Sequence, residues 1–114
     1  MDLLEAASGP LLVPALVVAE VAYIVASRLG TAPEVKFIGS IAAGELTVEP
    51  VHSSDWIRIA ELVWTYRDLS LGTTDASVIA AAERLGQDTI ATLDRRDFSV
   101  VRPKHVDAFN LVPD

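Results

Sequence analysis

Two spacings of apolar residues alternate along the chain. Short apolar and β-branched runs, typical of buried strands, are separated by longer stretches in which apolar residues recur every three or four positions, as on one face of a helix. Gly30 and Gly86 follow two of these stretches, as residues that end a helix do. Strands alternating with helices predict an α/β domain with a parallel sheet. The predicted strands cover 11–13, 46–51, 88–93 and 109–112, and the predicted helices cover 15–29, 31–43, 55–68 and 73–85.

The amino end does not fit this alternation. Residues 2–7 read as the end of a helix, and Ser8-Gly9-Pro10 is a stop signal. A doubly wound α/β domain normally starts with a strand that becomes central in the sheet. We therefore expect a sheet without that first central strand, which would leave unpaired backbone groups at the gap.

Composition limits the class of protein. With 114 residues, of which 51% are hydrophobic, the chain is expected to form one domain with a substantial core. The longest apolar run, 11–26, is interrupted by Pro14 and Glu20 and is too short to span a bilayer, and no basic segment precedes it. The absence of cysteine excludes disulfides and thiolate metal sites. These features predict a soluble, intracellular protein.

The formal charge of −7 argues against broad, phosphate-driven binding of nucleic acid. The charges are nevertheless unevenly distributed, because four of the nine basic residues lie close together near the carboxyl end. Such a cluster beside acids suits a metal site that admits a phosphate, although a solvated charged loop explains it equally simply. These residues are Arg95, Arg96, Arg102 and Lys104.

The stretch 72–98 carries two acids at informative places. A helix that ends at Gly86 and a strand that runs to Leu93 form half of a βαβ unit, and active sites lie at the carboxyl ends of such strands. Asp94 follows this strand. Asp75 heads the helical stripe 75, 78, 79 and 82, which is expected to face the core, so its carboxylate is directed toward the sheet edge. The simpler interpretation is that Asp75 complements the helix dipole.

Glu20 is the one charged residue between Glu5 and Arg28, and its helical neighbours are apolar. A carboxylate on an apolar face needs a cation, a hydrogen-bond donor or a metal, so a long-range salt bridge remains an alternative. Asp97 follows Asp94 in the same turn, where acids commonly serve only as turn formers. Carboxylates without His or Cys prefer Mg²⁺ or Mn²⁺, and such sites carry out phosphoryl chemistry.

Other motifs for chemistry are lacking. The chain has neither a Gly-rich phosphate loop nor a Gly-x-Ser-x-Gly elbow. His52 and His105 have no evident nucleophile partner and are expected at the surface. Trp56 and Trp64, eight residues apart, are expected to anchor the core or a subunit contact rather than to form a base-stacking platform.

Three segments of the chain resemble the PIN-domain nucleases, and most closely the VapC toxins of bacterial VapBC toxin–antitoxin modules. Order and spacing match over essentially the whole chain, and the last segment is the most specific. The segments are Val18-Ala19-Glu20-Val21-Ala22-Tyr23, the helix that starts Thr74-Asp75-Ala76-Ser77, and Thr92-Leu93-Asp94-Arg95-Arg96-Asp97-Phe98.

The resemblance implies a three-layer α/β/α PIN-like domain over residues 1–114 and a metal-dependent endoribonuclease. It implies a cytoplasmic toxin that binds Mg²⁺ or Mn²⁺, forms a homodimer and is inhibited by a cognate antitoxin. By position, Glu20, Asp75 and Asp94 match the catalytic metal-binding acids, and Asp97 matches a further metal ligand that is less regular in the family. The implied reaction is hydrolysis of an RNA phosphodiester.

The sequence departs from the family pattern at its amino end. The first acid of the family follows the first, central strand, and the sequence begins after that point; Asp2 lies in the predicted helix and does not replace it. An alternative function is therefore a catalytically impaired PIN-like module that only binds an antitoxin or associates with itself. A phosphoacceptor signalling domain shares the size and acidity, but it requires paired acids after a first strand and a lysine after a late strand.

Overall fold

The strands and helices follow the predicted alternation closely. The computed structural model describes residues 3–4, 11–91, 98, 101–106 and 108–112. The elements within these residues are β1 (Leu3–Leu4), β2 (Leu11–Pro14), α1 (Ala15–Leu29), α2 (Thr31–Ala42), β3 (Leu46–Glu49), α3 (Ser53–Thr65), the 3₁₀ turn η1 (Arg67–Leu69), α4 (Thr73–Leu85), β4 (Thr89–Ala91) and β5 (Asn110–Val112).

The described strands form one sheet in the order β3-β2-β1-β4-β5. β2 pairs with β3 in parallel, β4 pairs with β5 in parallel, and β1 is antiparallel to both β2 and β4. Because β1 reverses direction relative to each neighbour, β2 and β4 run the same way. Four of the described strands are therefore parallel, which confirms the predicted α/β fold with a parallel sheet.

The helix predicted for residues 2–7 is wrong at Leu3–Leu4, because these two residues form β1. Leu4 lies opposite Leu12 of β2 and opposite Ile90 of β4, so β1 occupies the centre of the sheet where a gap was expected. Without β1 the facing edges of β2 and β4 would carry unpaired N–H and C=O groups inside the protein. This pairing outweighs the weak local preference for a helix.

The core is built around α4. Its residues 76–82 are all buried, and Val78, Ile79 and Ala82 are fully so, which confirms that the stripe headed by Asp75 faces inward. Alanines on this helix let its backbone approach the sheet closely, and α4 contacts both β1 and β2. The strands add fully buried Val13 and Ile90 to the same cluster.

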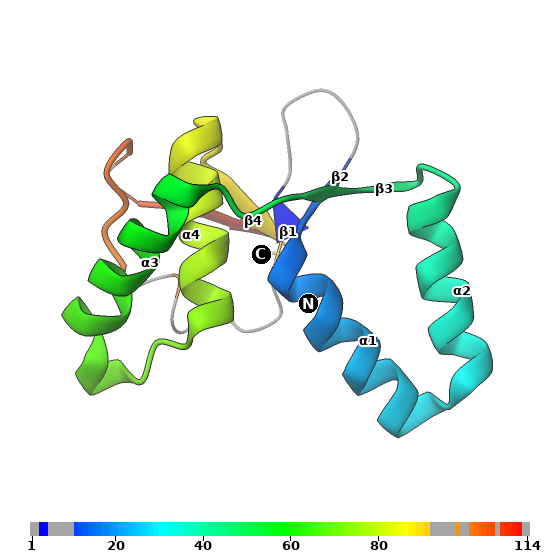
Figure 1. Cartoon of the computed structure of the whole chain (residues 1–114). Coiled ribbons are helices and arrows are strands. Elements are labelled where there is room, and N and C mark those ends of the chain that lie inside the picture. The colour runs from blue at the N-terminus through cyan, green and yellow to red at the C-terminus, as the bar shows by residue number, and fades with distance from the viewer. Residues whose placement is uncertain (1–2, 5–10, 92–97, 99–100, 107, 113–114) are drawn as a thin grey trace.

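The helices form two pairs on either side of the sheet centre (Figure 1). α3 packs beside α4, while α1 and α2 pack on each other and extend away on the opposite side (Figure 1). α1 buries Val17 alone among its residues and α2 buries none. Several large apolar side chains of this α1–α2 hairpin are exposed: Tyr23, Ile24, Leu29, Val35 and Ile38. No helix in the described part of the chain is long and apolar enough to cross a membrane.

Candidate metal site and its surroundings

Glu20 and Asp75 lie at the same edge of the sheet. α1 begins directly after β2, so Glu20 stands in its second turn, just past the carboxyl end of that strand. α4 has 13 residues and runs back along the three-residue β4 after a short turn. At about 1.5 Å per helical residue and 3.3 Å per strand residue, α4 is about twice as long as β4. Its first turn, with Asp75, therefore lies beyond the carboxyl end of β4, and α4 also contacts α1.

Glu20 is exposed, so the expectation that it lies on an apolar buried face is wrong. Its neighbours Tyr23 and Ile24 are 74% and 40% exposed. The reason is that α1 packs through the face of Val17, and the remaining apolar residues of this helix are left partly or fully open. A solvated carboxylate needs no protein cation to compensate it, and it is accessible to a ligand from solution.

Asp75 is half-buried and is the acidic residue of the first turn of α4. Buried Ala76 and Ser77 follow it directly, and the Ser77 hydroxyl donates to the carbonyl of Thr74 at 2.5 Å. The position is compatible with both interpretations of this residue, because an acid there complements the helix dipole and also borders the edge where Glu20 lies. Asp75 belongs to α4, which buries more residues than any other described helix.

Asp94 and Asp97 lie outside the described residues, as do Arg95 and Arg96. Among the described residues, no group of three or more His, Cys, Asp or Glu side chains is close enough to hold a metal. The described part of the chain thus places two of the four predicted ligands at one edge. Their donor chemistry, carboxylate oxygen without nitrogen or sulfur, fits a hard divalent cation.

Two members of the predicted basic cluster, Arg102 and Lys104, lie among the described residues. The Lys104 ammonium lies 3.8 Å from Glu61, and its backbone N–H donates to the Glu83 carboxylate at 2.8 Å. Glu83 is eight residues beyond Asp75 on α4, which is about 12 Å along the helix axis. The backbone N–H of Arg102 donates to the Tyr66 hydroxyl. Lys104 therefore lies near the end of α4 that is away from Asp75, while Asp94 and Asp97, the acids beside which it was predicted, lie outside the described residues.

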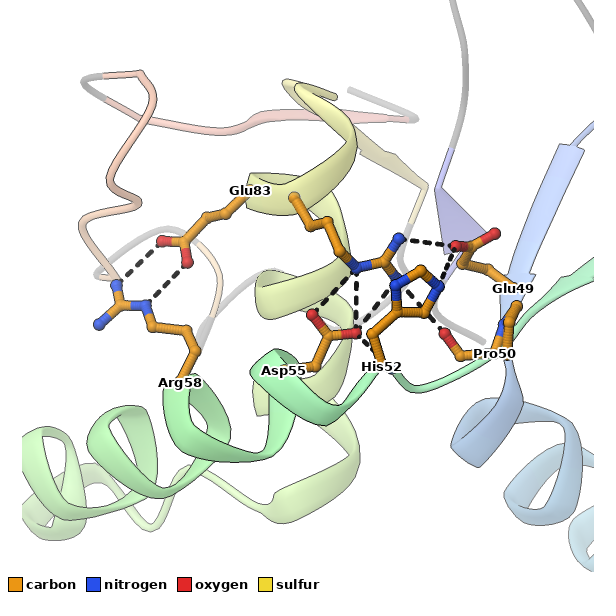
Figure 2. A network of polar contacts seen from close by, with 7 residues as sticks. Glu49, Pro50, His52, Asp55, Arg58 and Glu83 are labelled. Atoms are coloured by element: carbon orange, nitrogen blue, oxygen red, sulfur yellow. Dashed lines mark hydrogen bonds and ion pairs between the residues drawn. The ribbon is translucent and has the colours of Figure 1, made fainter.

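That opposite end holds an ion-pair network that the sequence did not reveal. The Arg84 guanidinium donates to both carboxylate oxygens of Asp55 at 3.0–3.2 Å and to Glu49 at 2.8 Å (Figure 2). It also donates to the carbonyl of Pro50 at 3.3 Å. Arg84 therefore joins the end of β3, the start of α3 and the end of α4, three segments that are distant in the sequence.

Asp55 is the buried acid of this network, with a side chain 6% exposed. Burial alone would raise the pKa of Asp55, but the hydrogen bonds and charge of Arg84, together with the backbone N–H of His52, hold that pKa below its ordinary value of 3.8. The His52 N–H donates at 3.0 Å, so Asp55 also caps α3. α3 begins at Ser53, two residues before the predicted start, and His52 is its N-cap residue.

A second pair reinforces the contact between α3 and α4. The Arg58 guanidinium donates two hydrogen bonds to the Glu83 carboxylate, at 2.7 and 2.9 Å (Figure 2). These hydrogen bonds raise the pKa of Arg58 above its ordinary value, as those to Asp55 and Glu49 do for Arg84. His105 is only partly exposed, and its Nε2 lies 2.6 Å from the carbonyl oxygen of Gln87. Both contacts tie the end of α4 to its surroundings.

The two tryptophans lie on the surface of α3, so a role in the core is wrong. Trp56 is 49% exposed and Trp64 is 69% exposed. They flank a groove of about 510 Å³, whose lining consists of Trp56, Ile59, Ala60, Val63, Trp64, Arg67 and Thr73. The apolar pattern of α3 suggested burial of the indoles, yet the apolar residues that α3 buries in the core are Ile59 and Leu62, and the indoles remain exposed.

Comparisons with known proteins agree with the fold. The model of the PIN domain family matches residues 1–103. Ribonuclease VapC26 of Mycobacterium tuberculosis is 32% identical to this chain over 112 residues, in an alignment that covers 98% of this chain and 83% of that protein.

Proposed function

The chain belongs to the PIN-domain family, and from its likeness to a VapC ribonuclease we propose that it is a metal-dependent endoribonuclease that acts as the toxin of a toxin–antitoxin system. The observation that carries this proposal in the structure is the placement of Glu20 and Asp75 at one sheet edge, on α1 and α4. Residues 1–114 act in it as a single PIN-like domain.

The proposed site consists of Glu20, Asp75 and Asp94 as catalytic metal-binding acids and Asp97 as a further ligand. Their oxygen donors fit Mg²⁺ or Mn²⁺. When bound, such an ion neutralises negative charge on the scissile phosphate and lowers the pKa of a coordinated water. Half-buried Asp75 fixes one side of the site, because the helix that carries it is packed into the core. Exposed Glu20 faces the side from which RNA approaches.

The proposal includes two protein partners. A cognate antitoxin would inhibit the enzyme, and a second copy of the chain would form a homodimer. The exposed apolar side chains of the α1–α2 hairpin support a protein contact, because large apolar patches on a surface usually mark one. Since cellular RNA is the substrate, the proposal places the protein in the cytoplasm.

The decisive experiment is cleavage of a mixed pool of structured RNA by the purified chain, with Mn²⁺ or with EDTA. The isosteric substitutions Asp75→Asn and Glu20→Gln remove one carboxylate charge each. Because each leaves the metal one ligand short, we expect cleavage to need Mn²⁺ and to fall by at least about a hundredfold in either variant.

A matched control is Asp88→Asn, the same change at an exposed acid that follows the opposite end of α4. It should leave cleavage unchanged, and circular dichroism should confirm that all variants are folded. Metal-dependent cleavage that persists in Asp75→Asn would refute the site, and cleavage that is unaffected by EDTA would refute the metal.

The alternative is a PIN-like module that binds an antitoxin or itself and cleaves nothing. The exposed apolar surface of helices α1, α2 and α3 favours binding, and catalysis does not require it. A folded chain that shows no cleavage in Mn²⁺ while it forms a stable dimer or antitoxin complex would support this alternative over the nuclease.

A further inference from the structure

The groove on α3 opens beside the first turn of α4. Trp64 lies in the last turn of α3, and Thr73, the first residue of α4, completes the lining of the groove. Asp75 follows two residues later in the same helical turn. The groove therefore opens at the same end of α4 as the proposed catalytic edge.

Arg67 gives the groove a charged aromatic surface. Its guanidinium carbon lies 4.2 Å from the centre of the Trp64 ring, a cation–π contact. Nη1 of Arg67 donates a hydrogen bond to the carbonyl of Trp64 at 2.8 Å. Among the described residues, the Arg67 guanidinium has no other hydrogen-bond acceptor. Arg67 is exposed, so its guanidinium is accessible to an anion from solution.

The lining of this groove is positively charged, although the chain as a whole is acidic. The chain carries a formal charge of −7, yet the charged residue that lines the groove is a cation. The amino terminus of α4, at Thr73, adds the positive end of a helix dipole. An apolar, aromatic groove with a positive rim matches a nucleotide strand, which has flat bases and a phosphate backbone.

We propose that this groove is a subsite for single-stranded RNA, in which a base stacks on Trp64 and Arg67 binds the adjoining phosphate. Trp56, the other indole of the groove, offers a second apolar wall. The proposal rests on the ribonuclease function and assigns Trp64 and Arg67 as positioning residues for its substrate. It differs from the expectation that the two tryptophans anchor the core or a subunit contact rather than form a base-stacking platform.

The test is binding of a short, fluorescein-labelled, single-stranded oligoribonucleotide in EDTA, which prevents metal-dependent cleavage. Both tryptophans of the chain line the groove, so their emission reports its occupancy directly. Stacking should quench this emission. Trp64→Ala should weaken binding about tenfold or more, because stacking of one base contributes that much. Trp64→Phe should retain most of the affinity.

Two further variants define the contact. Arg67→Gln should weaken binding and lower the slope of log K against log salt by about one, as expected for a lost phosphate contact. Ile57→Ala is the matched control, because Ile57 lies on the same helix at 68% exposure and does not line the groove. It should leave binding unchanged. Equal loss in Ile57→Ala and Trp64→Ala would overturn the proposal, and so would RNA binding without any change in tryptophan emission.

Sedimentation velocity separates RNA from a second copy of the chain. If Trp64→Ala converts a dimer to a monomer and leaves RNA affinity unchanged, the groove is a dimer contact and the proposal is wrong. Cleavage in Mn²⁺ is measured separately. Cleavage that depends on Asp75 together with RNA affinity that is independent of Trp64 refutes the subsite alone. RNA bound through Trp64 without any cleavage refutes the nuclease and leaves the subsite standing.

Discussion

Arg84 is the residue whose loss should destabilise the fold most through a single polar group. Replacement by Met keeps most of the side-chain volume and removes the guanidinium, so Asp55 loses three contacts and Glu49 loses one. Asp55 would remain as a 6% exposed carboxylate with one backbone partner, the N–H of His52. The Arg84 guanidinium and the Asp55 carboxylate form their ion pair at low solvent exposure. Their interaction is therefore expected to contribute more to stability than a solvent-exposed salt bridge does.

The magnitude follows from that geometry. Removing one partner of a buried ion pair costs about 3–5 kcal/mol of the free energy of unfolding, because the other charge is left uncompensated. The retained bond from His52 and the 20% exposure of Arg84 reduce this cost. We expect Arg84→Met to lower the free energy of unfolding by about 2–4 kcal/mol at neutral pH. The double variant with Asp55→Asn should recover part of that loss.

The pH dependence provides a second readout. Because the folded-state pKa of Asp55 lies below its ordinary value of 3.8, its contribution to stability is present above about pH 4 and is lost as the pH falls through the lower, folded-state pKa. In Arg84→Met, burial without the guanidinium favours the protonated carboxyl. The difference in stability between wild type and variant should therefore be largest at neutral pH and shrink as the medium becomes acidic.

Urea denaturation followed by circular dichroism, at several pH values, measures this difference. Arg28→Met is the control, since Arg28 is an exposed arginine in the last turn of α1 and should cost little. A loss below about 1 kcal/mol in Arg84→Met, equal to that of the control, would refute the reasoning, as would a difference that stays constant from acidic to neutral pH.

Three other predictions follow from the structure. Gly86→Ala should cost about 1 kcal/mol in urea denaturation, because φ at Gly86 is +68°, whereas Gly39→Ala, inside α2, should be neutral or stabilising. Removing residues 1–4 should lower the free energy of unfolding by about 2 kcal/mol or more, because β2 and β4 lose the strand between them; an unchanged urea midpoint would contradict this. Mn²⁺ should raise the melting temperature of the wild type and not that of Asp75→Asn, which a thermal-shift assay in Mn²⁺ and in EDTA decides.

The sequence predicted the elements well where local signals were strong. Gly30 and Gly86 end α1 and α4, as their positions in the pattern indicated. β2 ends at Pro14, which has no backbone N–H to donate to a neighbouring strand. These boundaries depend on backbone conformation within a few residues, and such information is present in the sequence itself.

Features that depend on distant contacts could not be predicted in this way. β1 forms because β2 and β4 need a partner between them, a requirement that nothing in residues 2–7 encodes. The apolar runs of α1 and α3 suggested burial, but a helix buries one face, and Glu20 and Trp64 lie on the other. The partners of Arg84 are separated from it by 29 and 35 residues, so no spacing rule could pair them.

The two described acids of the candidate site are held with very different rigidity. Asp75 lies in the first turn of a helix that is buried from residue 76 to 82 and tied at its other end by Arg84 and Glu83. Glu20 belongs to a helix whose one buried residue is Val17, packed against a second helix with none. Its position relative to Asp75 therefore depends on a small area of contact between α1 and the core. The topology places both acids at the same edge, but only packing determines which of them forms the fixed side of the site.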